Sequence, residues 1–115
     1  MGYGVEAWGG GPTDTTAPEV SNVVPTPGTA IDPAGEVRFD VTDDSGEFAN
    51  LLVTVDQRGV GEVVHDGERF RGYYGALSTR ELVAGGFRYK IRRSGGWTST
   101  PTFRVYAVDA VGNYI

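Results

Sequence analysis

Short stretches in which apolar and polar residues alternate are the feature that most constrains the fold of this chain. Successive side chains of a β-strand point to opposite faces, so a period of two predicts strands with one buried face. The alternation occurs in residues 20–24, 37–42, 51–56, 60–65, 68–74, 87–92 and 103–108. No window keeps a helical period, and a short helix or loop is expected only at 78–83. The pattern predicts an all-β protein.

Turn-forming residues separate these stretches at the spacing typical of a sandwich. Asp66-Gly67 predicts a two-residue hairpin turn, and Gly59 and 94–96 predict further turns. The 115 residues include 18 glycines and 6 prolines and are 39% hydrophobic, which suits a β-domain with a core and many tight turns. We expect one antiparallel β-sandwich of about six or seven strands over residues 14–115.

Residues 1–13, MGYGVEAWGGGPT, form a separate glycine-rich segment. Glycine loses much backbone freedom on folding, so this segment is not expected to fold alone. It nevertheless carries Tyr3, Val5 and Trp8, and large rings bury much surface for little lost rotamer freedom. We therefore expect an extended arm whose apolar residues dock on its own domain or on a neighbouring molecule.

Three short turn motifs resemble those of a known family. They are DTTAP at 14–18, DDSG at 43–46 and AVDAVGN at 107–113. Their order resembles the bacterial and phage immunoglobulin-like domains, which are close to fibronectin type III and cadherin-like modules. The resemblance covers roughly residues 14–113 and implies an immunoglobulin-like β-sandwich. It says little about the binding partner.

The chain departs from that family at its end. In the related domains a last strand follows the late turn, whereas only Tyr114 and Ile115 follow it here. A missing strand would leave unpaired backbone groups along one edge. The edge could be solvated, the chain's own arm could pair there, or another subunit could add a strand. We hypothesise that the arm, from the same or a neighbouring chain, covers this edge.

Charge is strongly segregated along the sequence. Residues 1–68 contain 13 acidic residues and only Arg38 and Arg58, whereas residues 69–115 contain 8 basic residues against Glu81 and Asp109. The first interpretation is that strands from the two halves lie side by side and pair their outward charges. The alternative is a polar surface that docks head to tail on copies of itself or on a charged assembly. The net charge of −5 disfavours nucleic acid as a partner.

No residue pattern indicates catalysis. His65 is the only histidine and stands beside Asp66, but neighbouring strand residues point to opposite faces. It is expected to be a solvent-facing residue next to a turn. The chain contains no cysteine, which excludes thiolate chemistry and disulfides. Asp43 and Asp44 lie in an expected loop rather than in a cleft that would hold two carboxylates at a fixed separation, so an acid-base pair is not expected. We expect a protein that is not an enzyme.

A calcium site is the one metal site that the resemblance implies. In related bacterial adhesin domains, acidic turns at one end of the domain can hold the ion. By position the candidate ligands are Asp14, Asp43, Asp44, Asp109 and Asn113. Calcium prefers such carboxylate and carbonyl oxygens from loops. The competing interpretation is that these side chains only cap turns by bonding nearby N–H groups.

Three aromatic residues near strand ends are candidate partner-binding residues: Tyr73, Tyr74 and Trp97. A solvent-facing ring there could stack on a sugar or on a partner protein. One of the two tyrosines is expected to point inward if the strand is regular. Trp97 has a competing interpretation as a core residue, because buried tryptophans are common in sandwiches.

The function expected from these features is structural. We expect a non-enzymatic structural or adhesion protein of a phage-type particle, located in the virion as a capsid decoration or on a tail. Met1 is followed by no basic start and no apolar signal core, so classical secretion is not expected. The longest apolar stretch, near 51–55, is too short to span a bilayer. The alternative is a module of a bacterial cell-surface protein that recognises glycan or host protein.

Overall fold

Eight β-strands and one turn of 3-10 helix make up the described part of the chain. The structure is a computed structural model that describes residues 4–7, 18–44, 46–57, 59–97, 100–109, Gly112 and Tyr114. The elements are β1 (Gly4–Ala7), β2 (Glu19–Val24), β3 (Val37–Thr42), β4 (Phe48–Gln57), β5 (Val60–His65), η1 (Gly72–Tyr74), β6 (Thr79–Val83), β7 (Gly86–Ile91) and β8 (Thr102–Asp109). Within these ranges there is no α-helix, which confirms the predicted fold class, and no helix that could cross a membrane.

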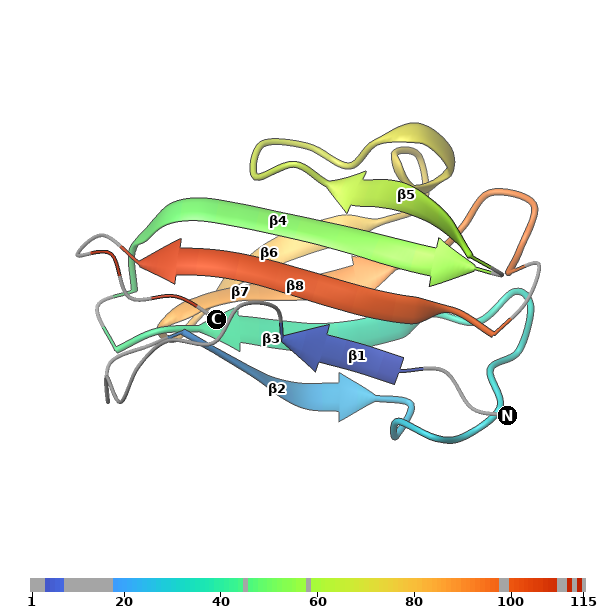
Figure 1. The fold of residues 1–115 in the computed structure, drawn as a ribbon, viewed down its shortest axis with the longest axis horizontal. Coiled ribbons are helices and arrows are strands. Elements are labelled where there is room, and N and C mark those ends of the chain that lie inside the picture. The colour runs from blue at the N-terminus through green and yellow to red at the C-terminus, as the bar shows by residue number, and fades with distance from the viewer. Residues whose placement is uncertain are drawn as a thin grey trace.

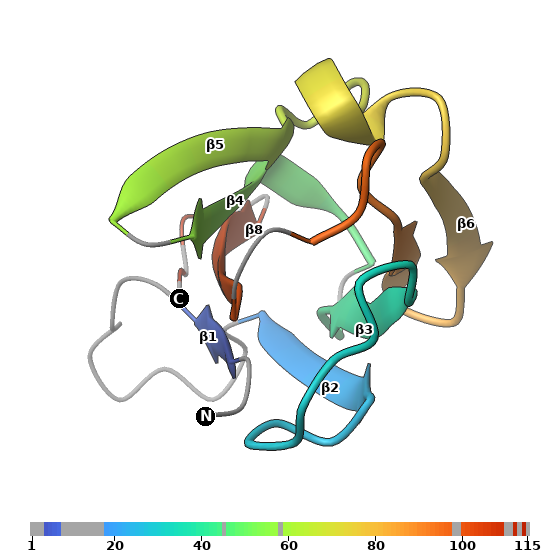
Figure 2. The ribbon, with the colours of Figure 1, turned by 90° about the vertical axis from the view of Figure 1, so that its right-hand side faces the viewer.

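The strands form two sheets that pack face to face as a sandwich (Figure 1). Sheet A has the order β1-β8-β4-β5, and sheet B has the order β2-β3-β7-β6. The end-on view separates the two layers (Figure 2). All the pairings between named strands are antiparallel except that of β1 with β8, which is parallel. The predicted antiparallel sandwich is confirmed, with one parallel edge strand added to it.

The core lies between the two sheets. Most of its residues are the apolar residues of the alternating stretches, whose side chains point inward. The burial pattern of β8 alternates without a break from Thr102 to Asp109. Burying one such valine or phenylalanine contributes roughly 1.5–3 kcal/mol. The buried apolar side chains are Val37, Phe39, Val41, Leu51, Val53, Val55, Val64, Tyr74, Tyr89, Ile91, Trp97, Phe103, Val105 and Ala107.

Two glycines mark places where backbone segments approach closely. Gly67 has a φ of 97°, and a Cβ on it would lie 2.9 Å from the carbonyl oxygen of Leu51. A Cβ on Gly86, at the start of β7, would clash with the carbonyl oxygen of Val41. Because glycine lacks that atom, the turn after β5 can lie against β4 and the start of β7 against β3.

The strand predicted over residues 68–74 is wrong, since Phe70 is the one residue of that segment that pairs with another strand. Phe70 makes an isolated bridge with His65, and the chain then enters η1. The Asp66 carboxylate accepts hydrogen bonds from the N–H groups of Glu68 and Arg69, each at 3.0 Å. Such side-chain bonding to the backbone competes with a strand ladder, so the chain turns where the alternation predicts a strand.

The predicted helix or loop over 78–83 is also wrong, because this segment is the edge strand β6. It pairs with β7 in continuous register from Thr79–Lys90 to Val83–Gly86. Arg80 and Leu82 occupy its inward positions, where the Arg80 guanidinium lies 4.1 Å from the centroid of the Phe87 ring. Hydrophobic periodicity does not reveal a strand whose inward side carries a charge.

The N-terminal arm supplies the strand at the open edge of β8. Gly4–Ala7 pair with Thr102–Val105, and the N–H of Gly4 donates to the carbonyl oxygen of Pro101 at 3.1 Å. The hypothesis that the arm covers this edge is confirmed for the chain's own arm (Figure 1). Further along β8, Tyr114 forms an antiparallel bridge with Val108. Both pairings satisfy backbone groups that a missing strand would leave open.

The outer edges of the two sheets differ in regularity. The register of β2 shifts between Ser21 and Val24, where Asn22 has a φ of 53°. The register between β4 and β5 shifts at Val53 and Thr54. Such bulges bend an edge strand and disfavour pairing with another chain. Strand β6 pairs with β7 over five residues without a register shift, and the shorter β1 pairs with β8 over four residues without one.

The segregated charges pair between the two halves of the sequence, as the first interpretation predicted. In sheet B, Asp40 lies directly opposite Arg88, and the two side chains approach to 2.8 Å. Sequence-distant acidic and basic residues are thus brought together by strand register. Among the described residues, ion pairs that join residues 1–68 to residues 69–115 include Arg71–Asp66, Arg88–Asp40, Arg92–Glu36 and Arg93–Glu62.

Candidate interaction surfaces

Tyr73 is the predicted partner-binding residue whose side chain the structure shows to be exposed. It belongs to η1 and is 54% exposed, and the nearby Leu77 is 50% exposed. The guanidinium of Arg93 lies 4.2 Å from the centroid of the Tyr73 ring, a cation–π contact. The carbonyl oxygen of Tyr73 accepts a hydrogen bond from the N–H of Ser94 at 2.7 Å. The ring is therefore held in place while one side stays open to a partner.

A hollow of about 410 Å³ is bordered by Arg93, whose guanidinium lies over the Tyr73 ring. Arg92 borders it and is fixed by a hydrogen bond to the carbonyl oxygen of Ala34 at 3.1 Å and by an ion pair with Glu36 at 3.5 Å. Its walls are largely apolar and include two arginines. The lining residues are Pro33, Ala34, Leu77, Arg92, Arg93, Gly95 and Gly96. We call the side chains of Tyr73, Leu77, Arg92 and Arg93 the Tyr73 surface; the first three are exposed, and the Arg93 side chain beneath the Tyr73 ring is largely buried.

Tyr74 and Trp97 were predicted as partner-binding residues, and the structure corrects this prediction. Tyr74 is 1% and Trp97 6% exposed, so neither ring is open to a partner. The Tyr74 hydroxyl donates to Oε1 of Glu62 at 2.8 Å, and burial together with this bond raises the pKa of the hydroxyl above its usual value. The Trp97 indole N–H donates to the carbonyl oxygen of Gly35 at 2.9 Å. Both rings are core residues whose polar atoms are satisfied internally.

The predicted contact residues of the arm are described only in part. Val5 lies in β1 opposite Phe103 of β8. Tyr3 and Trp8 lie outside the described residues. The structure therefore places the arm beside β8 through its backbone pairing alone.

The acidic turns predicted to bind calcium lie at one end of the sandwich, where β3 and β8 both finish (Figure 1). Asp43 and Asp109 are buried, and Asp44 is exposed. The backbone of Asp43 bonds across the turn, since its N–H donates to the carbonyl oxygen of Gly85 at 2.9 Å. The carbonyl oxygen of Asp109 accepts from the N–H of Gly112 at 3.2 Å.

Two of the five calcium candidates, Asp14 and Asn113, lie outside the described residues. Among the residues that are described, no three carboxylate or histidine side chains gather as metal ligands would. The calcium site thus stays a prediction. A rise in melting temperature with calcium would indicate a bound ion, because a ligand of the folded state stabilises it. An unchanged melting temperature would indicate turn caps.

His65 is buried, which corrects the prediction of a solvent-facing histidine. It is 1% exposed and packs edge-on against Phe70 and Tyr89, with ring centroids 4.7 and 5.3 Å away. Its Nδ1 accepts a hydrogen bond from the N–H of Gly67 at 3.1 Å. Burial, aided by the positive charge of Arg80, lowers the pKa of the imidazole to about 4. The neutral ring is therefore a packing element with an acceptor atom already in use.

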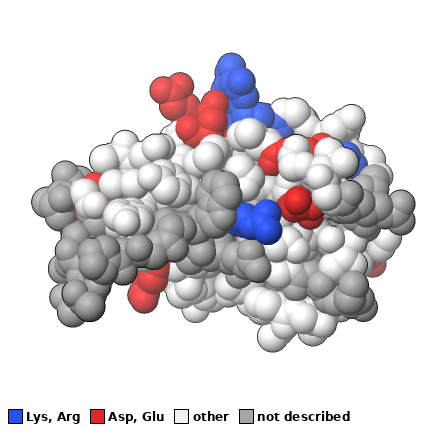
Figure 3. Space-filling view, viewed as in Figure 1, with Lys and Arg blue, Asp and Glu red and all other residues white. Residues whose placement is uncertain are grey.

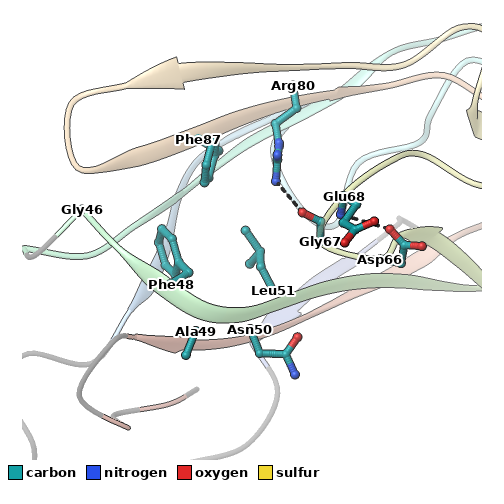
Figure 4. A pocket seen from close by; sticks show the side chains of 10 residues that line it. All are labelled: Gly46, Phe48, Ala49, Asn50, Leu51, Asp66, Gly67, Glu68, Arg80 and Phe87. Atoms are coloured by element: carbon teal, nitrogen blue, oxygen red, sulfur yellow. Dashed lines mark hydrogen bonds between the residues drawn. The ribbon is translucent and has the colours of Figure 1, made fainter.

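A groove of about 350 Å³ opens between β4 and β6 beside the turn that follows β5. Figure 4 shows the Arg80 side chain running from β6 toward Gly67, whose carbonyl oxygen it reaches at 3.4 Å. Phe87 lines the upper side, and Phe48 and Leu51 of β4 line the lower side. Residue spacing does not indicate this groove, because the groove depends on strand β6, which the alternation did not predict.

Searches of protein-family models, of curated proteins and of solved structures found no match to this chain.

Proposed function

We propose that this chain is a non-enzymatic structural or adhesion protein of a phage-type particle, either decorating a capsid or attached to a tail. The family resemblance supports an immunoglobulin-like assignment, and so does the strand order. One sheet of an immunoglobulin domain holds strands A, B, E and D, and the other holds C, F and G. With β2 as strand A, sheet B reads A-B-E-D, and β8 and β4 take the positions of F and C. Strand β1 then occupies the place of G.

The observation that carries a binding function is the Tyr73 surface. Binding energy at protein interfaces concentrates in a few tyrosine, tryptophan and arginine side chains. Here Tyr73 is 54% exposed, its ring lies 4.2 Å from the Arg93 guanidinium, and Leu77 beside it is 50% exposed. A ring that is already held in position loses little further freedom when a partner covers it. The Tyr73 surface is our primary attachment site.

Strand β6 is the exposed sheet edge that we propose as a second attachment site. The edge of β8 is covered by the chain's own arm, and the register shifts of β2 and β5 disfavour pairing there. Strand β6 is regular, and Leu82 on it is 80% exposed. An extended segment of a partner could add to this edge through backbone hydrogen bonds.

The alternative is an immunoglobulin-like module of a bacterial surface protein that recognises glycan or host protein. The hollow of about 410 Å³ beside Tyr73 is the observation that favours it. An exposed tyrosine ring next to a largely apolar hollow can stack on the apolar face of a sugar ring.

Particle association tests the proposal. Phage-type particles from the source genome are purified by density gradient, and the chain per particle is quantified by mass spectrometry. We expect the wild-type chain to sediment with the particles. Tyr73→Ala should reduce the bound amount about tenfold or more, because loss of an interface anchor costs more than about 1.4 kcal/mol. Tyr114→Ala, which removes a 37% exposed ring elsewhere, is the matched control and should bind normally.

The possible results of these experiments distinguish the virion assignment from the surface-protein alternative. A wild-type chain that never sediments with particles contradicts the virion assignment. Equal loading of Tyr73→Ala and wild type contradicts the role of the Tyr73 surface. Binding of the purified chain to an immobilised oligosaccharide array, lost in Tyr73→Ala and kept in Tyr114→Ala, would favour the surface-protein alternative.

A further inference from the structure

The outer edge of β6 carries backbone groups that no other strand in the described part of the chain uses. A two-residue turn joins β6 to β7, so Val83 and Gly86 on either side of it exchange hydrogen bonds with each other. Hydrogen bonding alternates along an antiparallel pair, which directs the N–H and C=O groups of Arg80 and Leu82 away from β7. Within the described residues, nothing hydrogen-bonds to these backbone groups.

The sandwich is open between β6 and the first half of β4. Strand β5 pairs with Val53–Gln57, so the earlier residues of β4 form the edge of sheet A on this side. The groove of about 350 Å³ lies between these two edges. Leu82 occupies an inward position opposite Phe87 and is nevertheless 80% exposed, because no described strand of sheet A covers it. A strand edge with free backbone groups therefore borders the groove.

The two ends of this groove differ in chemistry. Figure 4 shows Phe48 and Phe87 at one end and Glu68 and Asp66 at the other. The centroids of the two phenylalanine rings lie 6.0 Å apart, and both residues are only partly buried. Asp66 forms an ion pair with Arg71 at 3.3 Å, whereas the exposed Glu68 has no ion pair among the described residues. One end suits an apolar side chain, and the other suits a basic side chain.

Arg80 lies between the two ends and is committed to contacts within the chain. Its guanidinium lies 4.1 Å from the centroid of the Phe87 ring and donates to the carbonyl oxygen of Gly67 at 3.4 Å. The carboxylate of Glu68 is therefore left for a partner. The space-filling view shows acidic groups over the turn that follows β5, to the left of the basic groups and so nearer to the start of β4 (Figure 3). This arrangement favours a basic side chain at that end of the groove.

We propose that the edge of β6 and this groove bind an extended segment of a partner protein in which an apolar residue is followed, two positions later, by a lysine or arginine. An antiparallel segment would exchange hydrogen bonds with Arg80 and Leu82, and its residues opposite them would point into the groove. The residue opposite Leu82 comes first along the segment and packs against Leu82 and Phe87. The residue opposite Arg80 extends toward Glu68. This role of the groove rests on the proposed attachment through β6 and specifies the segment that attaches.

Synthetic peptides and amide NMR of the isolated, ¹⁵N-labelled chain test the segment. The probe is the N-acetylated, C-amidated peptide TTVTVTKTT, which presents its valines and its lysine on one face when extended. We expect the largest shifts at the amides of Arg80 and Leu82. The lysine peptide should bind about fivefold more tightly than TTVTVTETT, because Glu68 attracts lysine and repels glutamate. Absence of shifts at these amides with several millimolar peptide, or equal binding of the two peptides, would overturn the proposal.

A modified peptide and two substitutions separate strand pairing from the charge contact. The lysine peptide with N-methyl groups on its second valine and on the lysine cannot donate to the edge, and it should bind at least tenfold more weakly. Glu68→Gln should abolish the preference for lysine over glutamate. Glu19→Gln is the matched control on the opposite edge strand of sheet B and should keep the preference. Binding that survives N-methylation, or a preference that survives Glu68→Gln, would contradict the proposal.

Failure of this peptide site and failure of the proposed function give different results. Loss of peptide binding overturns the site and leaves particle association through the Tyr73 surface untouched. A chain that binds the lysine peptide as expected but never sediments with particles supports the site and contradicts the virion assignment. Shifts of the Arg80 and Leu82 amides that grow with chain concentration in the absence of peptide would assign the β6 edge to a second copy of the chain and overturn the partner segment.

Discussion

Asp40 shows how a charged residue can be buried on the outer side of a sheet. It is 3% exposed because Arg88 and Asn22 cover it. The Arg88 guanidinium donates two hydrogen bonds to its carboxylate, at 2.8 and 3.1 Å, and the Asn22 amide donates a third at 2.9 Å. The hydrogen bond from Arg88 is the main reason why the pKa of the Asp40 carboxyl is lowered. The left-handed conformation of Asn22, with a φ of 53°, occurs where β2 is bulged, next to this carboxylate.

Replacing Arg88 alone should therefore lower the free energy of unfolding more than replacing Arg88 and Asp40 together. Arg88→Met should lower the free energy of unfolding by about 2 kcal/mol, because it removes two of the three hydrogen bonds described above and the countercharge of a buried carboxylate. The double variant Asp40→Leu/Arg88→Met should lose less than Arg88→Met alone, since no buried charge remains. Urea unfolding of the wild type, the two single variants and the double variant measures this cycle. Additive single effects would contradict the coupling of the two side chains.

His65 makes stability depend on pH in a defined window. The imidazole binds a proton near pH 6.5 in the unfolded chain, but its pKa in the folded chain is lowered to about 4. The unfolded state thus binds more protons between these values. The free energy of unfolding should be highest above pH 6.5 and should fall by up to about 3 kcal/mol as the pH approaches 4.

Urea titrations at a series of pH values from 7 to 4 measure this effect. His65→Phe keeps an aromatic ring against Phe70 and Tyr89 and removes the titrating group. The variant should show a flatter pH dependence over the same range. If its curve runs parallel to that of the wild type, His65 does not cause the acid sensitivity.

At the scale of elements, alternation predicted six of the strands. The alternation at 20–24, 37–42, 51–56, 60–65, 87–92 and 103–108 corresponds to β2, β3, β4, β5, β7 and β8. Edge strand β6 was missed because its inward positions hold Arg80 and a largely exposed Leu82. The segment 68–74 alternates, but the Asp66 side chain bonds its backbone into a turn.

The candidate sites depend on contacts that spacing alone does not reveal. Adjacent tyrosines were expected to point in opposite directions, and Tyr73 is exposed while Tyr74 is buried. Which of the two faces outward depends on η1, which the sequence did not indicate. The stacking of Arg93 on Tyr73 depends on the loop after β7, and Leu77 lies in a segment with no periodic pattern.

The arm should contribute to stability as an element of sheet A. Deleting residues 1–13 removes β1 and exposes the edge of β8 from Thr102 to Val105. At roughly 1 kcal/mol for each lost hydrogen bond, the free energy of unfolding should fall by about 2–4 kcal/mol. Thermal unfolding followed by circular dichroism measures the change. Deleting only residues 1–3 keeps β1 and is the control; an equal melting temperature for both deletions would argue against a stabilising β1.

At the scale of the whole molecule, strand pairing divides the surface into regions with different properties. Acidic residues of 1–68 meet basic residues of 69–115 in ion pairs of sheet B and of the loops, so charges that are separated along the sequence are paired in the fold. Large apolar side chains stay exposed at the Tyr73 surface and at Leu82 on the outer edge of β6, which is 80% exposed.

Isotope-mixing NMR tests most directly whether the sandwich is completed by its own arm. Equal amounts of ¹³C/¹⁵N-labelled and unlabelled chain are mixed after unfolding and refolded together. We predict nuclear Overhauser effects between backbone protons of Gly4–Ala7 and Thr102–Val105 within one labelled chain, at the same intensity in dilute and concentrated samples. Effects seen only between labelled and unlabelled chains, or none at these positions, would contradict the account.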